Sequence, residues 1–354
     1  MRKIDNATVQ RVLDASNIVD VIGQFVELRQ KGPHYIGLCP FHNDRHATNF
    51  SVFPPRKCYT CFACGARGDV VKFLKEHLGL SFPDAIRWLG KRYGIIVDDA
   101  PIDYIPPPPR PKLAPLPMLV LPNEMIRPGR IEADPLVTWL RSLPWDGAQQ
   151  ARLNKTLSEY HIGHSRSGFT VFWQIDEDGR ARTGKMMKYK ADGHRDKETS
   201  YNFDWIHSAL NRQHIINTRT VEVKPCLFGL HLLHKYKGAD VHVVESEKTA
   251  VIMSVAYGNH AKQVWMACGG KENLNKDKLA PILKDGRRIV LYPDRDGVEE
   301  WKKKADMLNY VNIVVDDAPV TKWWRPVDGE KADIADVVIR NIIDFHNSQK
   351  TNDR

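Results

Sequence analysis

Two short metal-binding knuckles lie close together near the start of the chain. Cys39 and His42 are separated by two residues, and Cys61 and Cys64 repeat that spacing. Together they supply three thiolates and one imidazole, a tetrahedral donor set suited to zinc. Because all four positions are filled by protein, the spacing predicts one structural zinc ion and not a catalytic ion with an open position. Cys58 also forms a C-x-x-C pair with Cys61, so spacing alone does not fix the choice of ligands.

A second set of chemically competent residues is acidic and lies in the last third of the chain. Glu245 follows an apolar run, Asp294 and Asp296 follow another, and Asp333 and Asp336 open the last expected helix. Carboxylate oxygens are the ligands that hard cations such as Mg²⁺ or Mn²⁺ prefer. Metals held in this way can clamp nucleotide phosphates during an in-line displacement. The pattern predicts metal-dependent phosphoryl chemistry, and the alternative is helix-capping aspartates in solvated loops.

Alternating strand and helix signals must position these carboxylates. The alternation predicts a parallel α/β sheet, in which the chemistry sits at the carboxyl ends of the strands. Glu245 and Asp294 are both expected at that end. The expected strands are 241–245, 263–267, 287–294 and 312–315, and the expected helices are 247–258, 297–310 and 332–343.

The earlier part of the chain carries different signals. Apolar spacing near 3.6 residues, ending at glycine, predicts helices at 69–79 and 81–94, after a short helix or strand at 18–25. Strand-like runs at 169–176 and 180–189 flank an Asp-Gly pair, which indicates a hairpin.

A proline-rich stretch marks an expected domain boundary. Residues 101–117 contain eight of the 22 prolines, which favours a semi-rigid extended linker. We therefore expect a multi-domain α/β protein with a zinc ribbon and helices, a basic β-rich lobe and a parallel α/β domain. The expected boundaries are 1–100, a linker at 101–130, 131–235, 236–345 and a tail at 346–354.

Charge and composition limit the class of protein. The 354 residues carry a formal net charge of +9, and the excess lies in residues 1–235, whereas residues 236–354 hold 19 basic and 19 acidic groups. A basic balance permits phosphate-rich partners without proving one. No apolar run approaches the roughly 18–20 residues of a membrane helix, and the N-terminus lacks a signal-peptide core. A cytoplasmic protein without a membrane partner is expected, in which clustered cysteines indicate metal more than disulfides.

Residues 15–96 resemble the CHC2 zinc-binding domain of bacterial and phage DnaG-type DNA primases. The matching stretches are NIVDVIGQFVELRQKGPHYIGLCPFH, NFSVFP and YTCFACGARGDVVKFLKEHLGLSFPDAIRWLGKRYGI. In the family the cysteine pair is followed by glycine, as it is after Cys64, and this implies Cys61 and Cys64 as ligands in place of Cys58. The usual Thr-Pro-Ser-Phe after the histidine is Ala-Thr-Asn-Phe at 47–50 here. The resemblance implies a module that contacts single-stranded template DNA.

Basic and aromatic side chains of this segment suit phosphate contacts and base stacking. The aromatic residues concerned are Phe53 and Tyr59, whereas Phe62 is expected to pack inside the ribbon. Cys58 is expected to be a small buried residue and His46 a surface residue. The expected contacts with nucleic acid here are Arg45, Lys57 and Arg67, with Arg56 beside them.

Residues 236–345 resemble a Toprim domain. VVESEKTA matches its glutamate motif, YPDRDG its Asp-x-Asp motif and KADIADVV the acidic motif that follows. The resemblance implies that Glu245 is a general acid/base or a further metal contact, and that Asp294, Asp296 and Asp333 hold the divalent metal. Catalytic roles are thus expected for Glu245, Asp294 and Asp296. Asp336 lies in the same motif, in which the spacing of the acidic residues varies among family members.

Residues 131–235 are similar to the amino-terminal part of a primase RNA-polymerase core, a basic β-rich lobe. Four of its cations, at 180, 182, 188 and 190, share one parity, so most are expected to face one side of the hairpin. The alternative is a plain solvent-facing surface. Lys248, in the Toprim-like segment, is either a phosphate contact or a helix-surface lysine. The expected contacts with template or nucleoside triphosphate are Arg180, Arg182, Lys185, Lys188, Lys190 and Lys248.

The two resemblances together imply a compact DnaG-type DNA primase of a chromosome, phage or mobile element. Such a nucleotidyltransferase would polymerise ribonucleoside triphosphates on single-stranded DNA, with one structural Zn²⁺ and catalytic Mg²⁺ or Mn²⁺. It would act at the nucleoid, and a replicative helicase would be a partner in trans. The alternatives are a non-catalytic zinc/Toprim DNA-binding factor of recombination or mobilisation, and a Toprim nuclease.

Overall fold

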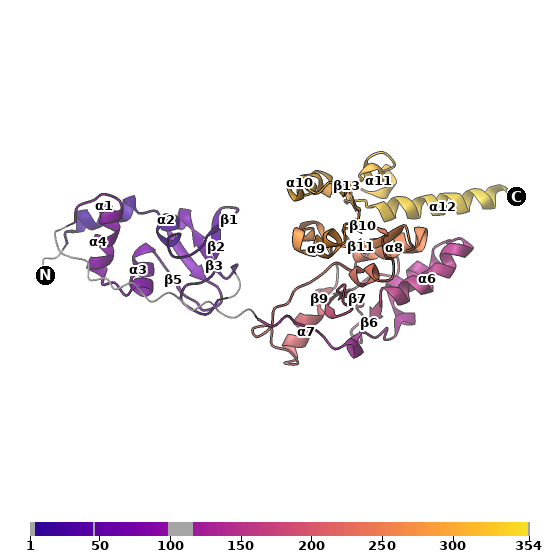
Figure 1. Cartoon of the computed structure of the whole chain (residues 1–354), viewed down its shortest axis with the longest axis horizontal. Coiled ribbons are helices and arrows are strands. Elements are labelled where there is room, and N and C mark those ends of the chain that lie inside the picture. Colours follow the sequence, from indigo (N-terminus) through magenta and orange to yellow (C-terminus); the bar gives the residue numbers. More distant parts are fainter. Residues whose placement is uncertain (1–3, 45–46, 98–115, 353–354) are drawn as a thin grey trace. The chain divides into compact units, whose positions relative to one another are not determined.

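The computed structural model describes residues 4–44, 47–97 and 116–352 (Figure 1). The chain divides into two compact units, residues 1–113 and 114–354. Each unit has its own hydrophobic core. The zinc-binding residues lie in the first unit and the acidic residues in the second, so the two predicted chemistries belong to different cores.

The first unit combines a five-stranded antiparallel sheet, in the order β1-β2-β3-β4-β5, with four α-helices in its described part. The two predicted helices are confirmed, and each begins where an aspartate or serine side chain accepts a backbone N–H: Asp69 from Lys72 and Ser81 from Asp84. The elements are α1 (Asn6–Ala15), α2 (Ile18–Ile22), β1 (Arg29–Lys31), β2 (His34–Gly37), β3 (Phe50–Phe53), β4 (Cys58–Cys61), β5 (Arg67–Gly68), α3 (Val70–Leu78) and α4 (Phe82–Arg92).

The second unit contains two four-stranded sheets. An antiparallel sheet has the order β6-β7-β8-β9, and its β7–β8 pair is the hairpin predicted around the Asp-Gly turn. Its elements and the helices around them are α5 (Pro135–Ser142), α6 (Gly147–Glu159), β6 (Gly163–His164), β7 (Thr170–Ile175), β8 (Ala181–Met187), β9 (Phe203–Trp205) and α7 (Ile206–Arg212).

The other sheet is parallel and has the order β11-β10-β12-β13. It confirms the predicted α/β alternation. Helix α8 packs on β10 and β11, and α10 packs on β13. The elements are β10 (Asp240–Val244), α8 (Glu247–Tyr257), β11 (Gln263–Ala267), α9 (Lys276–Lys284), β12 (Ile289–Tyr292), α10 (Val298–Leu308), β13 (Ile313–Val315), α11 (Ala318–Thr321) and α12 (Ile334–Asn352).

The larger of two buried hydrophobic clusters in the described part of the second unit extends from one sheet to the other. Phe172 and Met187, from the antiparallel sheet, belong to the same buried cluster as Val241 and Val243 of β10. Because this shared core fixes the two sheets against each other, side chains of β8 can reach residues at the end of β10. The predicted division at 235/236 therefore runs through one packed body.

The predicted linker lies partly outside the described residues. Residues 101–115 are not described, and the rest of the segment belongs to the second unit. Leu119 and Leu121 are buried, and their N–H groups donate to the carbonyls of Glu222 and Ala181. Alternate residues of the run at 118–121 thus pack against the second unit, whereas Met118 and Val120 remain exposed.

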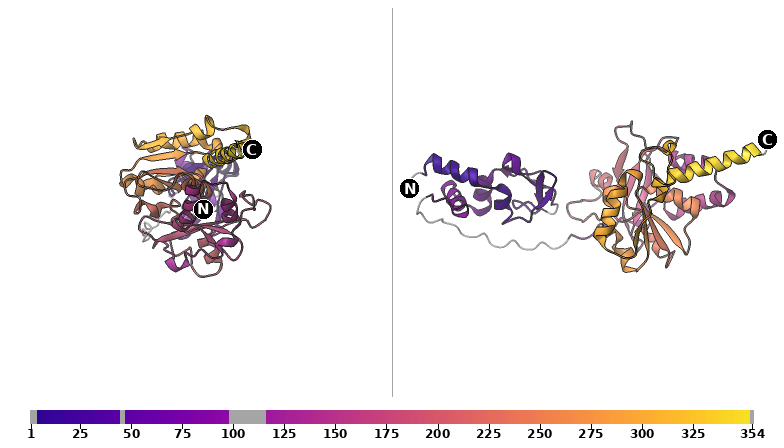
Figure 2. Two further views of the ribbon diagram at one scale, coloured as in Figure 1. Left: turned by 90° about the vertical axis from the view of Figure 1, so that its right-hand side faces the viewer. Right: turned by 90° about the horizontal axis from the view of Figure 1, so that it is seen from above.

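Helix α12 starts beside the parallel sheet and its second half projects from the body of its unit (Figure 2). Residues 343–351 are exposed, whereas Ala335, Val337 and Val338 are buried. The predicted tail from 346 therefore continues a helix. Within the described ranges, no helix is both long and apolar enough to cross a membrane.

Candidate functional site

The four predicted zinc ligands converge in the first unit. One ligand atom from each of Cys39, His42, Cys61 and Cys64 lies within 4.8 Å of all the others. The sulfurs of Cys39 and Cys64 are 3.8 Å apart, and Cys61 Sγ is 3.9 Å from His42 Nδ1. Two sulfurs bound tetrahedrally to zinc at about 2.3 Å are separated by roughly 3.8 Å. The donor set and its spacing therefore fit one tetrahedral zinc ion.

Backbone geometry holds the sulfurs in place. The N–H of Phe41 donates to Cys39 Sγ at 3.4 Å, and the N–H of Cys64 donates to Cys61 Sγ at 3.5 Å. Burial and the neighbouring thiol of Cys61 raise the pKa of the Cys39 thiol. Three neighbouring thiols lose their protons together only when a cation offsets the repulsion between the thiolates. This arrangement of sulfurs therefore suits a bound metal ion.

Asp44 orients the histidine ligand, and sequence reasoning missed it. Its Oδ1 is 3.6 Å from His42 Nε2, while its Oδ2 accepts the N–H of Cys39 at 2.8 Å. Asn49 donates to Oδ1 from the other side at 2.8 Å. A carboxylate behind a ligating histidine fixes the ring and makes it a better ligand. The only signal in the sequence was an acidic residue two positions after the histidine.

The parity of strand β4 excludes Cys58 from the ligand set. Tyr59 and Cys61 are buried on one face of the strand, whereas Cys58 and Thr60 are half-buried on the other. Successive side chains of a strand point to opposite faces. Cys58 is thus turned away from the site, which agrees with the ligand choice implied by the CHC2 resemblance. Cys58 is only half-buried, whereas it was expected to be buried.

Replacing Cys58 with serine is expected to leave one zinc ion per chain and an unchanged melting temperature of the first unit. Serine is close to cysteine in size, and position 58 contributes no ligand. Metal analysis by inductively coupled plasma mass spectrometry checks this prediction. Zinc content falling well below one per chain would show that Cys58 takes part in the site.

The predicted nucleic-acid contacts of the first unit are exposed where they are described. Lys57 and Arg67 both reach solvent, and Lys57 adopts a left-handed backbone conformation with φ 46° after a short turn. Tyr59 is fully buried in the core, so the expectation that it stacks on bases is wrong. Phe62 is 70% exposed, so the expectation that it packs inside the ribbon is wrong. Strand β4 ends at Cys61, so Phe62 lies in the turn that follows the strand. Arg45 and His46 lie outside the described residues.

The parallel sheet of the second unit brings the first two acidic motifs together. Strands β10 and β12 are neighbours, with Val244 opposite Tyr292, so Glu245 and Asp294 follow their ends on the same sheet edge. The Asp294 N–H donates to Glu245 Oε1 at 3.3 Å. A side chain at Gly297 would lie only 2.5 Å from that same oxygen, so a larger residue here would displace the Glu245 carboxylate.

The third acidic motif joins this edge from the start of α12. Asp333 and Asp336 cap the helix reciprocally: the Asp336 N–H donates to Asp333 Oδ1 at 3.0 Å, and the Asp333 N–H donates to Asp336 Oδ2 at 2.9 Å. Thr249 of α8 donates its hydroxyl to Asp333. The alternative expectation of helix-capping aspartates is therefore met at this helix.

Several carboxyl groups crowd together at this sheet edge, and their pKa values are raised. Burial first, and then the carboxylates of Asp333, Glu245, Asp296 and Asp336, raise the pKa of Asp294 to about 9. Burial also raises the pKa of Glu245 to about 7, and burial with Asp333 raises that of Asp336 to about 7. Asp294 Oδ1 is buried and makes no hydrogen bond. An orphaned oxygen among repelling carboxylates fits a divalent cation, which would supply the missing positive charge.

These carboxylates are less tightly gathered than the zinc ligands. Within 4–44, 47–97 and 116–352, the zinc set is the one group of at least three Cys, His, Asp or Glu side chains with all ligand atoms within 4.8 Å. Asp296 is exposed and lies 3.9 Å from Lys331. We define Glu245, Asp294, Asp296, Asp333 and Asp336 as the acidic cluster.

Two of the predicted cationic contacts, Arg182 and Lys185, are buried, and for Arg182 the expectation of a common face with residues 180, 188 and 190 open to a ligand is wrong. Every residue of β8 is buried, because both faces of the strand are covered. Lys185 Nζ lies 2.9 Å from Glu247 Oε2 and donates to the Gly269 carbonyl at 3.0 Å. Arg182 is 2% exposed and lies 3.7 Å from Asp176. Glu247 is the first residue of α8 and lies two positions after Glu245. Its role as the partner of Lys185 was missed by sequence reasoning.

The remaining cations lie nearer the surface. Arg180 is exposed and pairs with Asp176 and Asp178 at the hairpin turn. Lys188 is half-buried, with its ammonium 5.0 Å from the centre of the Phe169 ring. Lys190 pairs with Glu198.

Lys248 is half-buried and donates to the Gly193 carbonyl at 3.3 Å. Its charge lowers the pKa of Asp336, but burial and the charge of Asp333 have larger effects and raise that pKa. Lys248 is thus the cation of this set that faces the acidic cluster.

The first unit is, by its fold and donor set, a zinc ribbon of the Cys₃His type. Residues 4–103 match the family model of the CHC2 zinc finger, and residues 134–295 match a domain of unknown function, DUF6371. The resemblance to DnaG-type primases is thereby confirmed for the zinc-binding segment.

The sequence relatives of that segment are DNA primases. It is 38% identical over 98 residues to the DNA primase of Halalkalibacterium halodurans, a match covering 28% of this chain and 16% of the relative. It is 42% identical over 89 residues to the DNA primase of Neisseria meningitidis, covering 25% and 15%. The chain therefore spans about one sixth of the length of these curated relatives.

Solved structures of primases share a distant likeness with the whole chain. The zinc-binding and RNA polymerase domains of Aquifex aeolicus primase are 16% identical, with a TM-score of 0.34, covering 95% of this chain and 85% of that one. The primase fragment of the bacteriophage T7 primase-helicase protein is 15% identical, with a TM-score of 0.38, covering 87% and 95%.

Proposed function

We propose that this chain is a DNA primase that polymerises ribonucleotides on single-stranded DNA with Mg²⁺ or Mn²⁺ at the acidic cluster. The observation that carries the proposal is the meeting of Glu245 and Asp294 at one edge of a parallel sheet, with Asp333 and Asp336 beside them. The same chain carries a CHC2 zinc finger whose sequence relatives are DNA primases. The proposal includes the Toprim identity of residues 236–345.

In the proposed reaction, a 3′-hydroxyl oxygen attacks the α-phosphorus of a ribonucleoside triphosphate. A new O–P bond forms, the bond between the α-phosphorus and the α–β bridging oxygen breaks, and pyrophosphate leaves. A bound divalent cation supplies charge neutralisation of the triphosphate and lowers the pKa of the attacking hydroxyl. Asp294, Asp296 and Asp333 would hold that cation through their carboxylate oxygens. Without a cation, the charges of Asp333 and Asp296 raise the pKa of Asp294.

Glu245 would accept the proton of the hydroxyl or hold a further cation. Its pKa of about 7 suits proton transfer near neutral pH. Lys248, beside Asp336, would contact a phosphate of the triphosphate. Lys57 and Arg67 of the first unit would contact the phosphates of the template. A replicative helicase in trans and association with the nucleoid belong to the same proposal.

A primer-synthesis assay tests the proposal. Full-length protein is incubated with single-stranded DNA of mixed sequence, four ribonucleoside triphosphates and Mg²⁺ or Mn²⁺, and short RNA is resolved on a gel. We expect RNA products that fall by about 10²–10⁴-fold for Glu245→Gln, the usual contribution of a general acid or base. DNA binding without products over a broad range of templates and metals would overturn the proposal in favour of a binding factor, and DNA cleavage without synthesis would favour a nuclease.

A further inference from the structure

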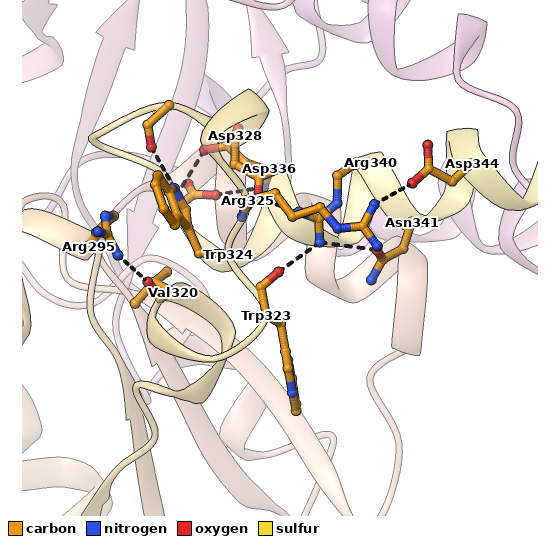
Figure 3. Close-up of polar contacts among 12 residues, drawn as sticks. Arg295, Val320, Trp323, Trp324, Arg325, Asp328, Asp336, Arg340, Asn341 and Asp344 are labelled. Atoms are coloured by element: carbon orange, nitrogen blue, oxygen red, sulfur yellow. Dashed lines mark hydrogen bonds and ion pairs between the residues drawn. The ribbon is translucent and has the colours of Figure 1, made fainter.

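Arg295 lies between Asp294 and Asp296 in the loop that follows β12, which we call the D-x-D loop. Its guanidinium, however, binds groups outside this loop. Its Nη1 donates to the Val320 carbonyl at 2.9 Å, and the guanidinium carbon lies 3.9 Å from the centre of the Trp324 ring (Figure 3). A planar guanidinium over the face of an indole is a favourable cation–π arrangement. The cation nearest in sequence to Asp294 is thus engaged by the segment between β13 and α12.

Two more hydrogen bonds extend this connection toward Asp333. The Arg295 N–H donates to the carbonyl of Ala332, the residue immediately before Asp333, at 2.9 Å. The Trp324 indole N–H donates to the Gly329 carbonyl at 2.8 Å. The loop that carries Asp294 is therefore joined to the segment that carries Asp333 by backbone, by side chain and by ring stacking.

The segment itself is anchored to helix α12. The side chain of Asp328 is 2% exposed, pairs with Arg340 and accepts the Arg325 N–H at 2.7 Å. Arg340 also donates to the Trp323 carbonyl at 2.9 Å (Figure 3). Because this ion pair is buried, it gives the segment a fixed base against which Trp324 can hold Arg295.

We propose that the Arg295–Trp324 pair is a clamp that keeps the D-x-D loop and Asp333 at the separation a divalent cation requires. The inference rests on the proposed function, because it assumes that the acidic cluster holds a metal. Like-charged carboxylates drift apart unless their supports are rigid, and groups behind metal ligands set their orientation. Arg295 and Trp324 are positioning residues, since they contact the supports of the ligands and not the metal.

Mn²⁺ binding to the full-length, zinc-loaded protein tests the clamp. Free Mn²⁺ is measured by electron paramagnetic resonance, and Asp294→Asn identifies the binding that belongs to the acidic cluster. Trp324→Leu is expected to weaken that binding about 10- to 100-fold, the usual cost of removing a support of a metal ligand. Trp324→Phe keeps an aromatic face and should retain most of the affinity. Arg295→Lys keeps the charge but loses the planar group, and should weaken binding as Trp324→Leu does.

Trp323 provides the matched control. It is the adjacent tryptophan and is 58% exposed, so Trp323→Leu should bind Mn²⁺ as the unchanged protein does. Equal affinity in Trp324→Leu and the unchanged protein would overturn the clamp, as would absence of Mn²⁺ binding in the unchanged protein. If Trp324→Leu does not fold by circular dichroism, Arg295→Lys decides. Mn²⁺ binding that depends on Trp324, without RNA synthesis, would uphold the clamp and count against the proposed function alone.

Discussion

Replacing Cys61 and Cys64 together with serine is expected to abolish zinc binding and unfold the first unit. Structural zinc in small domains contributes an apparent free energy of about 10–16 kcal/mol at neutral pH, which exceeds the stability of most domains of this size. The aromatic core beside the site depends on the knuckles. Phe41, whose N–H donates to Cys39 Sγ, stacks on Tyr59 with ring centres 5.5 Å apart. Without the metal, the two knuckles lose the bonds that join them, and the hydrogen bond from Cys39 to Asp44 and the stacking of Phe41 remain as their main supports.

Hydrogen–deuterium exchange with metal analysis measures this effect. Amides of β3 and β4, which pair Phe50 with Cys61 and Phe53 with Cys58, should lose their protection. Amides of the buried parallel sheet should keep theirs, because the second unit has a separate core. Cys58→Ser is the matched control, a cysteine-to-serine change on the opposite face of the same strand. One zinc ion per chain in the double variant, or protected strands without zinc, would contradict the prediction.

Asp294→Asn is expected to abolish RNA synthesis and, in the absence of divalent cation, to stabilise the second unit. The loss should be at least about 10²-fold, as for other charged or polar groups placed at a reacting centre. The stability gain should be roughly 1–2 kcal/mol, or about 2–8 °C in melting temperature, because asparagine avoids both the buried charge and the proton that a carboxyl with a raised pKa takes up on folding. A functional group that lowers stability is the usual compromise at such sites.

The sign of the pH dependence follows from the raised pKa values. In the folded protein Asp294 has a pKa of about 9, whereas an unfolded aspartate has one near 3.9. Between these values the folded state binds a proton that the unfolded state does not, so stability falls as the pH rises through this window. The gain from asparagine should therefore be larger at pH 9 than at pH 6. Glu245 and Asp336, each with a pKa of about 7, add to the same trend.

Thermal unfolding in buffer depleted of divalent cations, at pH 6 and pH 9, checks the prediction. Added Mg²⁺ should raise the melting temperature of the unchanged protein, by the free energy of its binding to the folded state, and should do so less for Asp294→Asn. Asp306→Asn, the same chemical change on the exposed face of α10, serves as the control and should change neither property. A variant that melts below the unchanged protein at pH 9 would refute the charge argument.

Much of the zinc centre could be predicted from local spacing. Two residues between paired ligands bring both onto one turn, so Cys39 with His42 and Cys61 with Cys64 required little knowledge of the rest of the fold. Asp44 could not be assigned, because its role depends on where the histidine ring points after the turn has formed. Phe62 was misjudged for a related reason: its exposure depends on where β4 ends.

The acidic cluster was predictable for a different reason. Alternating apolar strands and helices force a parallel sheet, and parallel strands bring their carboxyl ends to one edge. Glu245 and Asp294 had to lie near each other once β10 and β12 became neighbours. Strand order itself is a property of the whole sheet, so only the structure shows that β10 and β12 lie side by side.

By itself, the sequence determined which residues could bind a metal and on which kind of element each would lie, because these properties follow from residue type and short spacing. Only the tertiary structure decided the partners of the cations. Lys185 and Glu247 are 62 positions apart, and they meet because one core fixes β8 against the end of β10. Arg295 turns from its neighbouring aspartates to Trp324 because a segment anchored on α12 offers it a ring and a carbonyl. Burial decides such pairings, and burial depends on packing between elements distant in the chain.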